Sequence, residues 1–197
     1  MVAGLCGNVQ TPAGTRRDSW AFTLLDPPFA AMLTAGMREL SQEELRSCCA
    51  STTWMAAVAA RQPYADLTAL VAAGEAAIAA LDWPDVEEAL AAHPQIGERA
   101  AADQAATDRE AAWSRAEQSG TAGAAQTVLD AITRGNAVYE QRFGHVYLVR
   151  ATGRSAEEML GLLLARLAND EETERKIVRA ELAEIVRLRL ETAVTGG

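Results

Sequence analysis

Only one stretch of the chain has the composition of a β-strand, and this limits the fold more than any other feature. Residues 145–151, His-Val-Tyr-Leu-Val-Arg-Ala, lie between Gly144 and Gly153. A strand needs partner strands to form a stable sheet, and no second run of this kind is present. Alanine, the commonest residue, favours helices. We therefore predict an all-α, single-domain helical bundle with one extended segment, whose main-chain N–H and C=O groups are available to a ligand.

Helix-start signals divide most of the remaining chain. Ser41, Thr107 and Ser155 are each followed three residues later by Glu, which is the pattern of a capping box. Asp66 can cap a further helix, and Pro84 stands in a position typical of a first helical turn. The predicted helices cover approximately residues 41–61, 66–78, 84–93, 107–118, 122–143, 155–167 and 170–192.

The two ends of the chain lack helical periodicity. Residues 1–36 contain several glycines and prolines, which predicts a loosely ordered N-terminal extension. We expect a helical domain over 37–192 and a C-terminal tail over 193–197.

Charge and cysteine usage restrict the partners and the compartment. A formal net charge of -9 opposes binding to nucleic acid or to an anionic membrane surface. No apolar run approaches the ~20 residues of a membrane span, and the N-terminus lacks the order of a secretory signal. The 3 cysteines include the adjacent Cys48 and Cys49, which suit neither a disulfide framework nor zinc. We expect a cytoplasmic protein with reduced thiols.

Common cofactor and nucleophile motifs are missing from the sequence. We find no P-loop, no dinucleotide-binding fingerprint, no G-x-S-x-G and no H-E-x-x-H. With only 2 histidines, a transition-metal site is not expected, and we predict no cofactor and no metal. An enzyme of this kind would use acid–base groups and oriented dipoles on a substrate that carries its own electron sink.

His93 lies where the predicted helix 84–93 must end. Pro94 disfavours helical dihedrals at His93, and Gly97 permits a reversal of the chain. A partly cationic imidazole is stabilised at a helix C-terminus by about 0.3–1 kcal/mol, so His93 could serve only as a cap. An imidazole with a pKa near neutrality could instead accept and release a proton. The spacing alone leaves both roles open.

Ser114, Glu117 and Gln118 are spaced i, i+3 and i+4 on the predicted helix 107–118. All three side chains would project from one face within a single turn. A solvated helix face is the ordinary explanation of such a group, and a polar lining of a site is the alternative.

Several motifs together indicate a family. In order along the chain they are His93-Pro94-Gln95-Ile96-Gly97, Ser114-x-x-Glu117-Gln118, Asn136-x-x-Tyr139-x-x-Arg142-Phe143-Gly144, Gly153-Arg154-Ser155 and Ile185-Val186-Arg187-Leu188-Arg189-Leu190. Over about residues 37–192 the chain resembles the 2-oxo-4-hydroxy-4-carboxy-5-ureidoimidazoline (OHCU) decarboxylases. The resemblance implies the helical fold of that family and cofactor-free decarboxylation of OHCU, a small molecule, to (S)-allantoin in urate breakdown. It also implies a homodimer.

The resemblance also assigns roles to individual residues. His93, Glu117 and Arg189 match the catalytic positions, and which of His93 and Glu117 moves which proton stays open. The matching substrate-binding positions are Pro94, Ser114, Gln118, Tyr147, Leu148, Val149, Arg150 and Ala151. The chain departs from the commoner family pattern at His145, where an aromatic residue is usual, and at Arg150, where a small or apolar residue is more frequent. A non-catalytic helical module that binds ureides or another protein is the alternative function.

Overall fold

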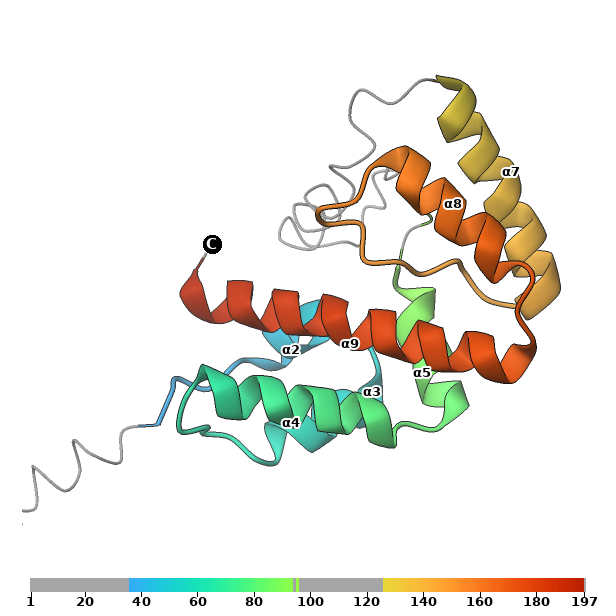
Figure 1. Cartoon of the computed structure of the whole chain (residues 1–197). Coiled ribbons are helices and arrows are strands. Elements are labelled where there is room, and N and C mark those ends of the chain that lie inside the picture. Colours follow the sequence, from blue (N-terminus) through green and yellow to red (C-terminus); the bar gives the residue numbers. More distant parts are fainter. Residues whose placement is uncertain (1–35, 94, 96–125, 197) are drawn as a thin grey trace, which may run out of the picture. The chain divides into compact units, whose positions relative to one another are not determined.

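The structure is a computed structural model that describes residues 36–93, 95 and 126–196 (Figure 1). Within these residues the chain forms seven α-helices and no β-strand. The all-α prediction is therefore confirmed. Three predicted parts lie outside the described residues: the helix 107–118, the start of the helix 122–143, and all of the N-terminal extension except residue 36.

The first predicted helix is in fact two helices, so the prediction of a single helix over 41–61 is wrong. Helix α2 spans Gln42–Cys48 and begins with the capping box at Ser41, as expected. Cys49 then adopts an extended conformation (φ -153°, ψ 121°). The Ser51 hydroxyl accepts a hydrogen bond from the main chain of Trp54, which starts helix α3, Thr52–Ala59. A second good N-cap residue thus interrupts a pattern whose apolar spacing looks continuous.

The next two helices lead to His93. Helix α4, Leu67–Ala80, is capped by Asp66 as predicted, and helix α5 spans Trp83–Ala91 with a proline in its first turn. Because α5 ends at Ala91, His93 lies in the turn after the helix and not in its last turn. Its main-chain N–H still donates to Leu90 O at 2.9 Å, so the turn stays attached to α5.

The last three helices also carry the predicted signals at their ends. Helix α7 spans Gln126–Phe143 and is followed by Gly144, whose φ of 78° is one that other residues rarely adopt. Helix α8, Ala156–Arg166, begins with the predicted capping box at Ser155. Helix α9, Glu171–Thr195, is capped by Asp170 and runs three residues beyond the expected end at residue 192.

Two hydrophobic clusters hold these helices together. The first cluster is formed mainly by buried residues of α2, α3, α4, α5 and α9. The second cluster is formed by α7, α8 and the residues that connect them. In Figure 1 the long helix α9 runs between α4 on one side and α7 with α8 on the other.

The β-rich run 145–151 is an irregular segment with no strand partner in the described part of the chain, as predicted. Its side chains alternate between the two clusters. Leu148 is buried in the first cluster, whereas Tyr147, Val149 and Ala151 are buried in the second. This alternation is typical of an extended chain, and it makes residues 147–151 the link between the two clusters.

Two further findings concern the described residues alone. No single helix among them is long and apolar enough to cross a membrane, although α4 and α5 together meet the same length and composition test as a pair bent by 116°. Cys48 and Cys49 are both buried and form no disulfide.

Candidate active site

The His93 side chain is buried, with 8% of its surface exposed. Its Nδ1 lies 2.9 Å from Ala89 O, in the last turns of α5. Because a carbonyl oxygen can only accept, Nδ1 carries the proton and Nε2 keeps its lone pair. Nε2 is buried and has no hydrogen-bond partner among the described residues. A buried acceptor without a partner indicates a place for a ligand or a water molecule.

The imidazole is neutral in this environment. Burial, together with the positive charge of Arg189, lowers the pKa of His93 to about 3. The expectation of a pKa near neutrality is therefore not met. The cationic form of the capping hypothesis also fails, because His93 caps α5 as a neutral N–H donor to Ala89 O.

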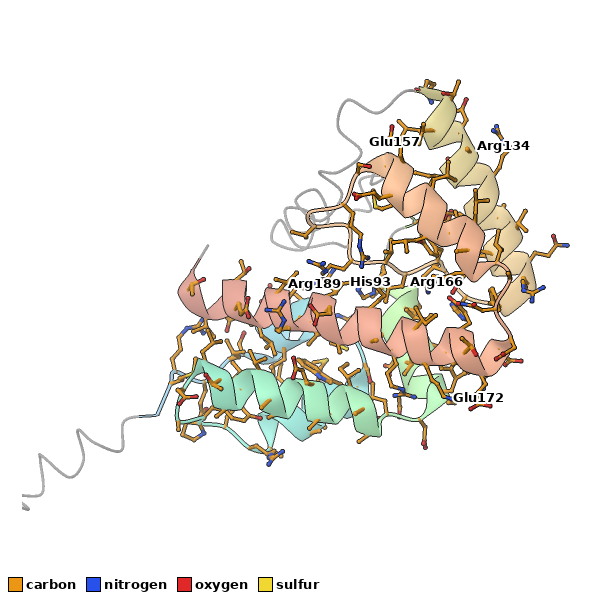
Figure 2. All side chains as sticks on the ribbon, viewed as in Figure 1. His93, Arg134, Glu157, Arg166, Glu172 and Arg189 are labelled. Carbon is orange, nitrogen blue, oxygen red and sulfur yellow. The ribbon has the colours of Figure 1, made fainter. Side chains whose placement is uncertain are left out.

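Arg189 reaches this region from α9 and also contacts helix α2. Its Nη1 lies 3.3 Å from Ser47 O, near the C-terminal end of α2. In Figure 2 the labelled His93, in the turn after α5, lies near Arg189 of α9, and the Arg189 charge is close enough to act on the imidazole. The structure thus brings together two of the three predicted catalytic residues, which are far apart in the sequence.

A side chain of the H-P-Q-I-G motif fastens the His93 turn to α7. Gln95 Nε2 donates to Glu140 Oε1 at 2.6 Å. This bond joins the turn after α5 to the second cluster, and it gives Gln95 a positioning role that the motif alone did not reveal.

The extended segment 147–151 is fastened by a buried ion pair. Arg166 of α8 donates from Nη1 to Leu148 O at 2.7 Å and from Nε to Glu174 Oε1 at 2.7 Å. Both partners are almost fully buried, with exposed side-chain fractions of 6% for Arg166 and 0% for Glu174. The Arg166 guanidinium also lies 4.8 Å from the centre of the Tyr147 ring.

The buried Glu174 carboxylate accepts hydrogen bonds from three side chains. It accepts from the Tyr139 hydroxyl and from Asn169 Nδ2 at 2.8 Å, in addition to Arg166. Burial would raise the pKa of Glu174, but the hydrogen bonds from Arg166, Tyr139 and Asn169 outweigh it and hold the pKa below its usual value. The carboxylate is therefore charged and paired, and it joins α9 to α7 and α8.

The residue at 145 keeps an aromatic environment although it is a histidine. The His145 ring makes edge contacts with Trp83 at 5.3 Å and with Tyr139 at 5.5 Å between centroids, and it lies 6.2 Å from Phe143. His145 therefore packs as an aromatic ring does, and its departure from the family pattern leaves the local packing aromatic.

The main chain of Arg150 is held by two side chains. Its N–H donates to Glu181 Oε2 at 2.6 Å, and its carbonyl accepts from Arg154 Nη1 at 3.0 Å. Glu181 was not among the predicted site residues. A single glutamate on a long helix gives no pattern that would single it out, whereas Arg154 belongs to the quoted Gly153-Arg154-Ser155 motif.

The remaining predicted site residues, Pro94, Ser114, Glu117 and Gln118, lie outside the described residues. Within the described part, no group of three or more His, Cys, Asp or Glu side chains is placed to hold a metal ion.

The helices and the connecting segment define an all-α protein with a buried histidine at the end of a short helix. Residues 36–191 match the sequence family of OHCU decarboxylases. The chain belongs to this family.

Solved structures agree with this assignment at the level of the fold. A crystal structure of OHCU decarboxylase in the presence of (S)-allantoin superimposes with a TM-score of 0.67, at 24% identity, over 79% of this chain and 99% of that one. A crystal structure of (S)-allantoin synthase gives a TM-score of 0.54 at 18% identity, over 78% of this chain and 49% of that one.

A curated relative from Arabidopsis thaliana, the uric acid degradation bifunctional protein TTL, is 28% identical over 153 residues. The matched region is 77% of this chain and 47% of the relative, so the chain spans about half the length of that protein.

Proposed function

We propose that this protein decarboxylates OHCU to (S)-allantoin in urate degradation, without a cofactor. The single observation that carries the proposal is the buried, neutral His93, whose Nε2 has no partner among the described residues and whose ring lies within the field of Arg189. A lone pair with a positive charge nearby suits an anionic substrate that must exchange a proton.

The substrate supplies its own electron sink. When the bond between the carboxylate and the ring carbon breaks, its electron pair moves into the neighbouring C=N unit, the nitrogen of that unit takes up a proton from solvent, and CO₂ leaves. The ring must then receive a proton on one face to give a single enantiomer. A site that holds the carboxylate out of the ring plane and keeps one proton donor on one side meets both demands.

We assign the proton transfer to Nε2 of His93. In its neutral form Nε2 accepts a proton, for which the substrate 4-hydroxyl is the candidate donor, and the imidazolium can return it to the ring carbon. Burial, with the Arg189 charge as the smaller cause, lowers the pKa of His93 to about 3. A bound carboxylate beside Arg189 would offset that charge and raise the pKa of His93, so the imidazole becomes more basic when the substrate binds.

The resemblance to the family adds four residues to the proposed site: Pro94, Ser114, Glu117 and Gln118. In this assignment Glu117 orients the substrate 4-hydroxyl or assists His93, and the other three contact the ureido group and the ring. Arg189 offers the planar set of donors that suits a carboxylate.

We further propose that the protein is a cytoplasmic homodimer that makes (S)-allantoin for purine breakdown. The dimer is supported by the family resemblance only. Light scattering at micromolar concentration tests it, and a mass near the 21.0 kDa of a single chain would refute it.

The decisive test of function generates OHCU in situ from urate and follows the optical activity of the allantoin that forms. The proposal predicts rapid formation of (S)-allantoin in the presence of the protein. Formation at the spontaneous rate, as a racemate, would contradict it. If the protein were then stabilised against heat by allantoin, the alternative of a non-catalytic ureide-binding module would be favoured.

A further inference from the structure

The main-chain groups at the two edges of the extended segment 147–151 differ in their hydrogen-bond partners. In an extended chain, the main-chain groups of residues two apart point to the same edge. Leu148 and Arg150 therefore share one edge, and Tyr147 and Val149 share the other. The alternate burial of Leu148 and its neighbours in different hydrophobic clusters supports this geometry.

Side chains hold the edge that carries Leu148 and Arg150. Arg166 donates to Leu148 O at 2.7 Å. Glu181 accepts from Arg150 N at 2.6 Å, and Arg154 donates to Arg150 O at 3.0 Å. Arg154 Nη1 also lies 3.2 Å from each carboxylate oxygen of Glu181, so that Glu181, Arg154 and the Arg150 peptide form a closed ring of hydrogen bonds.

At the opposite edge Ala151 O accepts from the main-chain N–H of Arg154 at 3.0 Å, whereas the main-chain groups of Tyr147 and Val149 have no partner in the described part of the chain. Tyr147 and Val149 are buried, with 2% and 3% of their surface exposed. No hydrogen bond joins their main-chain N–H or C=O groups to any described residue. Buried main-chain groups need partners, and a ureido group offers both N–H donors and a carbonyl acceptor.

We propose that Glu181, together with Arg154, positions the extended segment so that its free edge at Val149 faces the ureido end of the substrate. This inference rests on the proposed function and adds two positioning residues to it. Neither residue touches the reacting atoms. Their effect passes through the main chain of Arg150, whose N–H and C=O they fix on the side away from the ligand.

The Glu181–Arg154 pair is more exposed than the Arg166–Glu174 pair, so a substitution in it should cost less stability. Arg154 and Glu181 have 25% and 17% of their side-chain surface exposed, whereas Arg166 and Glu174 are almost wholly buried. Loss of a buried pair partner costs about 3–5 kcal/mol, which would obscure any effect on the site. Glu181 therefore gives the cleaner experiment.

The experiment compares two substitutions at Glu181 with a matched control on the same helix. Glu181→Leu removes the acceptor for Arg150 N–H, and Glu181→Gln keeps an acceptor oxygen. Glu184→Leu removes a carboxylate that pairs with Arg187 at 3.0 Å on the outer face of α9. Each protein is assayed for kcat and KM with OHCU generated in situ, and amide hydrogen exchange is measured at Arg150.

We expect Glu181→Leu to raise KM at least tenfold while kcat changes less than threefold, and to accelerate exchange of the Arg150 amide at least tenfold. Glu181→Gln and Glu184→Leu should stay within threefold of the unaltered protein in all three quantities. The proposal is overturned if Glu181→Leu leaves KM unchanged, if Glu184→Leu has the same effect, or if Glu181→Gln is as impaired as Glu181→Leu.

Two provisions keep the test decisive. If Glu181→Leu does not fold, Arg154→Gln weakens the bond to Arg150 O and is judged by the same measurements against Glu184→Leu. Hydrogen exchange at Arg150 is measured without substrate. If the unaltered protein does not turn over OHCU but Glu181→Leu still accelerates exchange at Arg150, the proposed function is disproved and the positioning of the segment by Glu181 and Arg154 is not. If the unaltered protein is active but Glu181→Leu leaves exchange at Arg150 unchanged, only the positioning role of Glu181 and Arg154 is disproved.

Discussion

A histidine that is buried in its neutral form links folding to pH. In the unfolded chain His93 takes up a proton below a pH of about 6.5, whereas burial and Arg189 lower its pKa to about 3 in the folded protein. Between these values the unfolded state binds more protons than the folded state. The folded protein must therefore lose stability as the pH falls from about 6.5 toward 3, and this penalty is absent above 6.5.

We predict that acidification destabilises the unaltered protein more than His93→Asn, because asparagine does not titrate. The difference between the two free energies of unfolding should change by at most about 1.4 kcal/mol for each pH unit below 6.5. Urea unfolding of both proteins at pH 7, 6 and 5 measures it. Parallel losses of stability in the two proteins would show that the folded imidazole is not protected from protonation.

Arg189 gives the second prediction at this scale. Lysine keeps the charge of arginine but loses the planar fork with which Arg189 contacts Ser47 O and faces the His93 region. We expect Arg189→Lys to lower kcat/KM at least tenfold, about 1.4 kcal/mol. Steady-state kinetics measure kcat/KM, and a melting curve checks that the variant is folded. Equal kcat/KM in the two proteins would reduce Arg189 to a structural contact.

The position of His93 in a turn could be predicted from its neighbours Pro94 and Gly97. Its protonation could not, because it depends on Ala89 O and on Arg189, whose approach is a property of the folded chain. For the same reason Glu181 could not be predicted as a site residue, because nothing in its local sequence indicates that it accepts a hydrogen bond from Arg150 N.

At the scale of the helices, the contact of α7 with α8 depends on a glycine. A Cβ atom added at Gly135 would lie 2.5 Å from Leu163 Cδ2 and 3.2 Å from its Cγ, and Leu163 is fully buried. A Cβ atom at Gly161, an exposed position on α8, would meet nothing within 4 Å. The two glycines therefore form a matched pair.

We predict that Gly135→Ala destabilises the protein by about 1–3 kcal/mol through overpacking. Gly161→Ala should instead be neutral or stabilising by up to about 1 kcal/mol, because alanine is the better helix former. Denaturant unfolding of the two variants gives both values. If Gly135→Ala proved as stable as Gly161→Ala, the described packing of α7 on α8 would be wrong.

Helix starts were predictable because a capping residue acts on its own next few residues. Ser41, Asp66 and Ser155 each cap a helix as expected. The interruption at Cys49 was missed because the apolar spacing runs on across it, although Ser51 provides a second cap. The partners of the extended segment were also unpredictable, since Arg166 and Glu181 lie on other helices.

For the molecule as a whole, the family match begins at residue 36. We predict that a protein starting at Met37 keeps the melting temperature and the kcat/KM of the full chain. Its Met37 nitrogen can still donate to Tyr64 O, which lies at 2.7 Å. Insolubility or inactivity of the shortened protein would make residues 1–36 part of the functional unit.

The central claim is that the fold exists to hold one neutral imidazole, with Nε2 free to exchange a proton with the substrate. His93→Asn tests it, because asparagine can still donate to Ala89 O but cannot titrate. At neutral pH its free energy of unfolding should stay within about 1 kcal/mol of the unaltered protein, since one hydrogen bond of that order is at stake. Any loss of activity is then a loss of chemistry.

The measurement is the rate and the optical activity of allantoin formed from OHCU by His93→Asn and by the unaltered protein under identical conditions. A positioned acid–base group contributes typically about 10²–10⁴-fold, so we predict a fall in kcat of at least a hundredfold. The allantoin should then become nearly racemic as spontaneous decay takes over. Full, stereospecific turnover by the folded His93→Asn protein would contradict the account and would direct attention to Glu117 as the group that moves the proton.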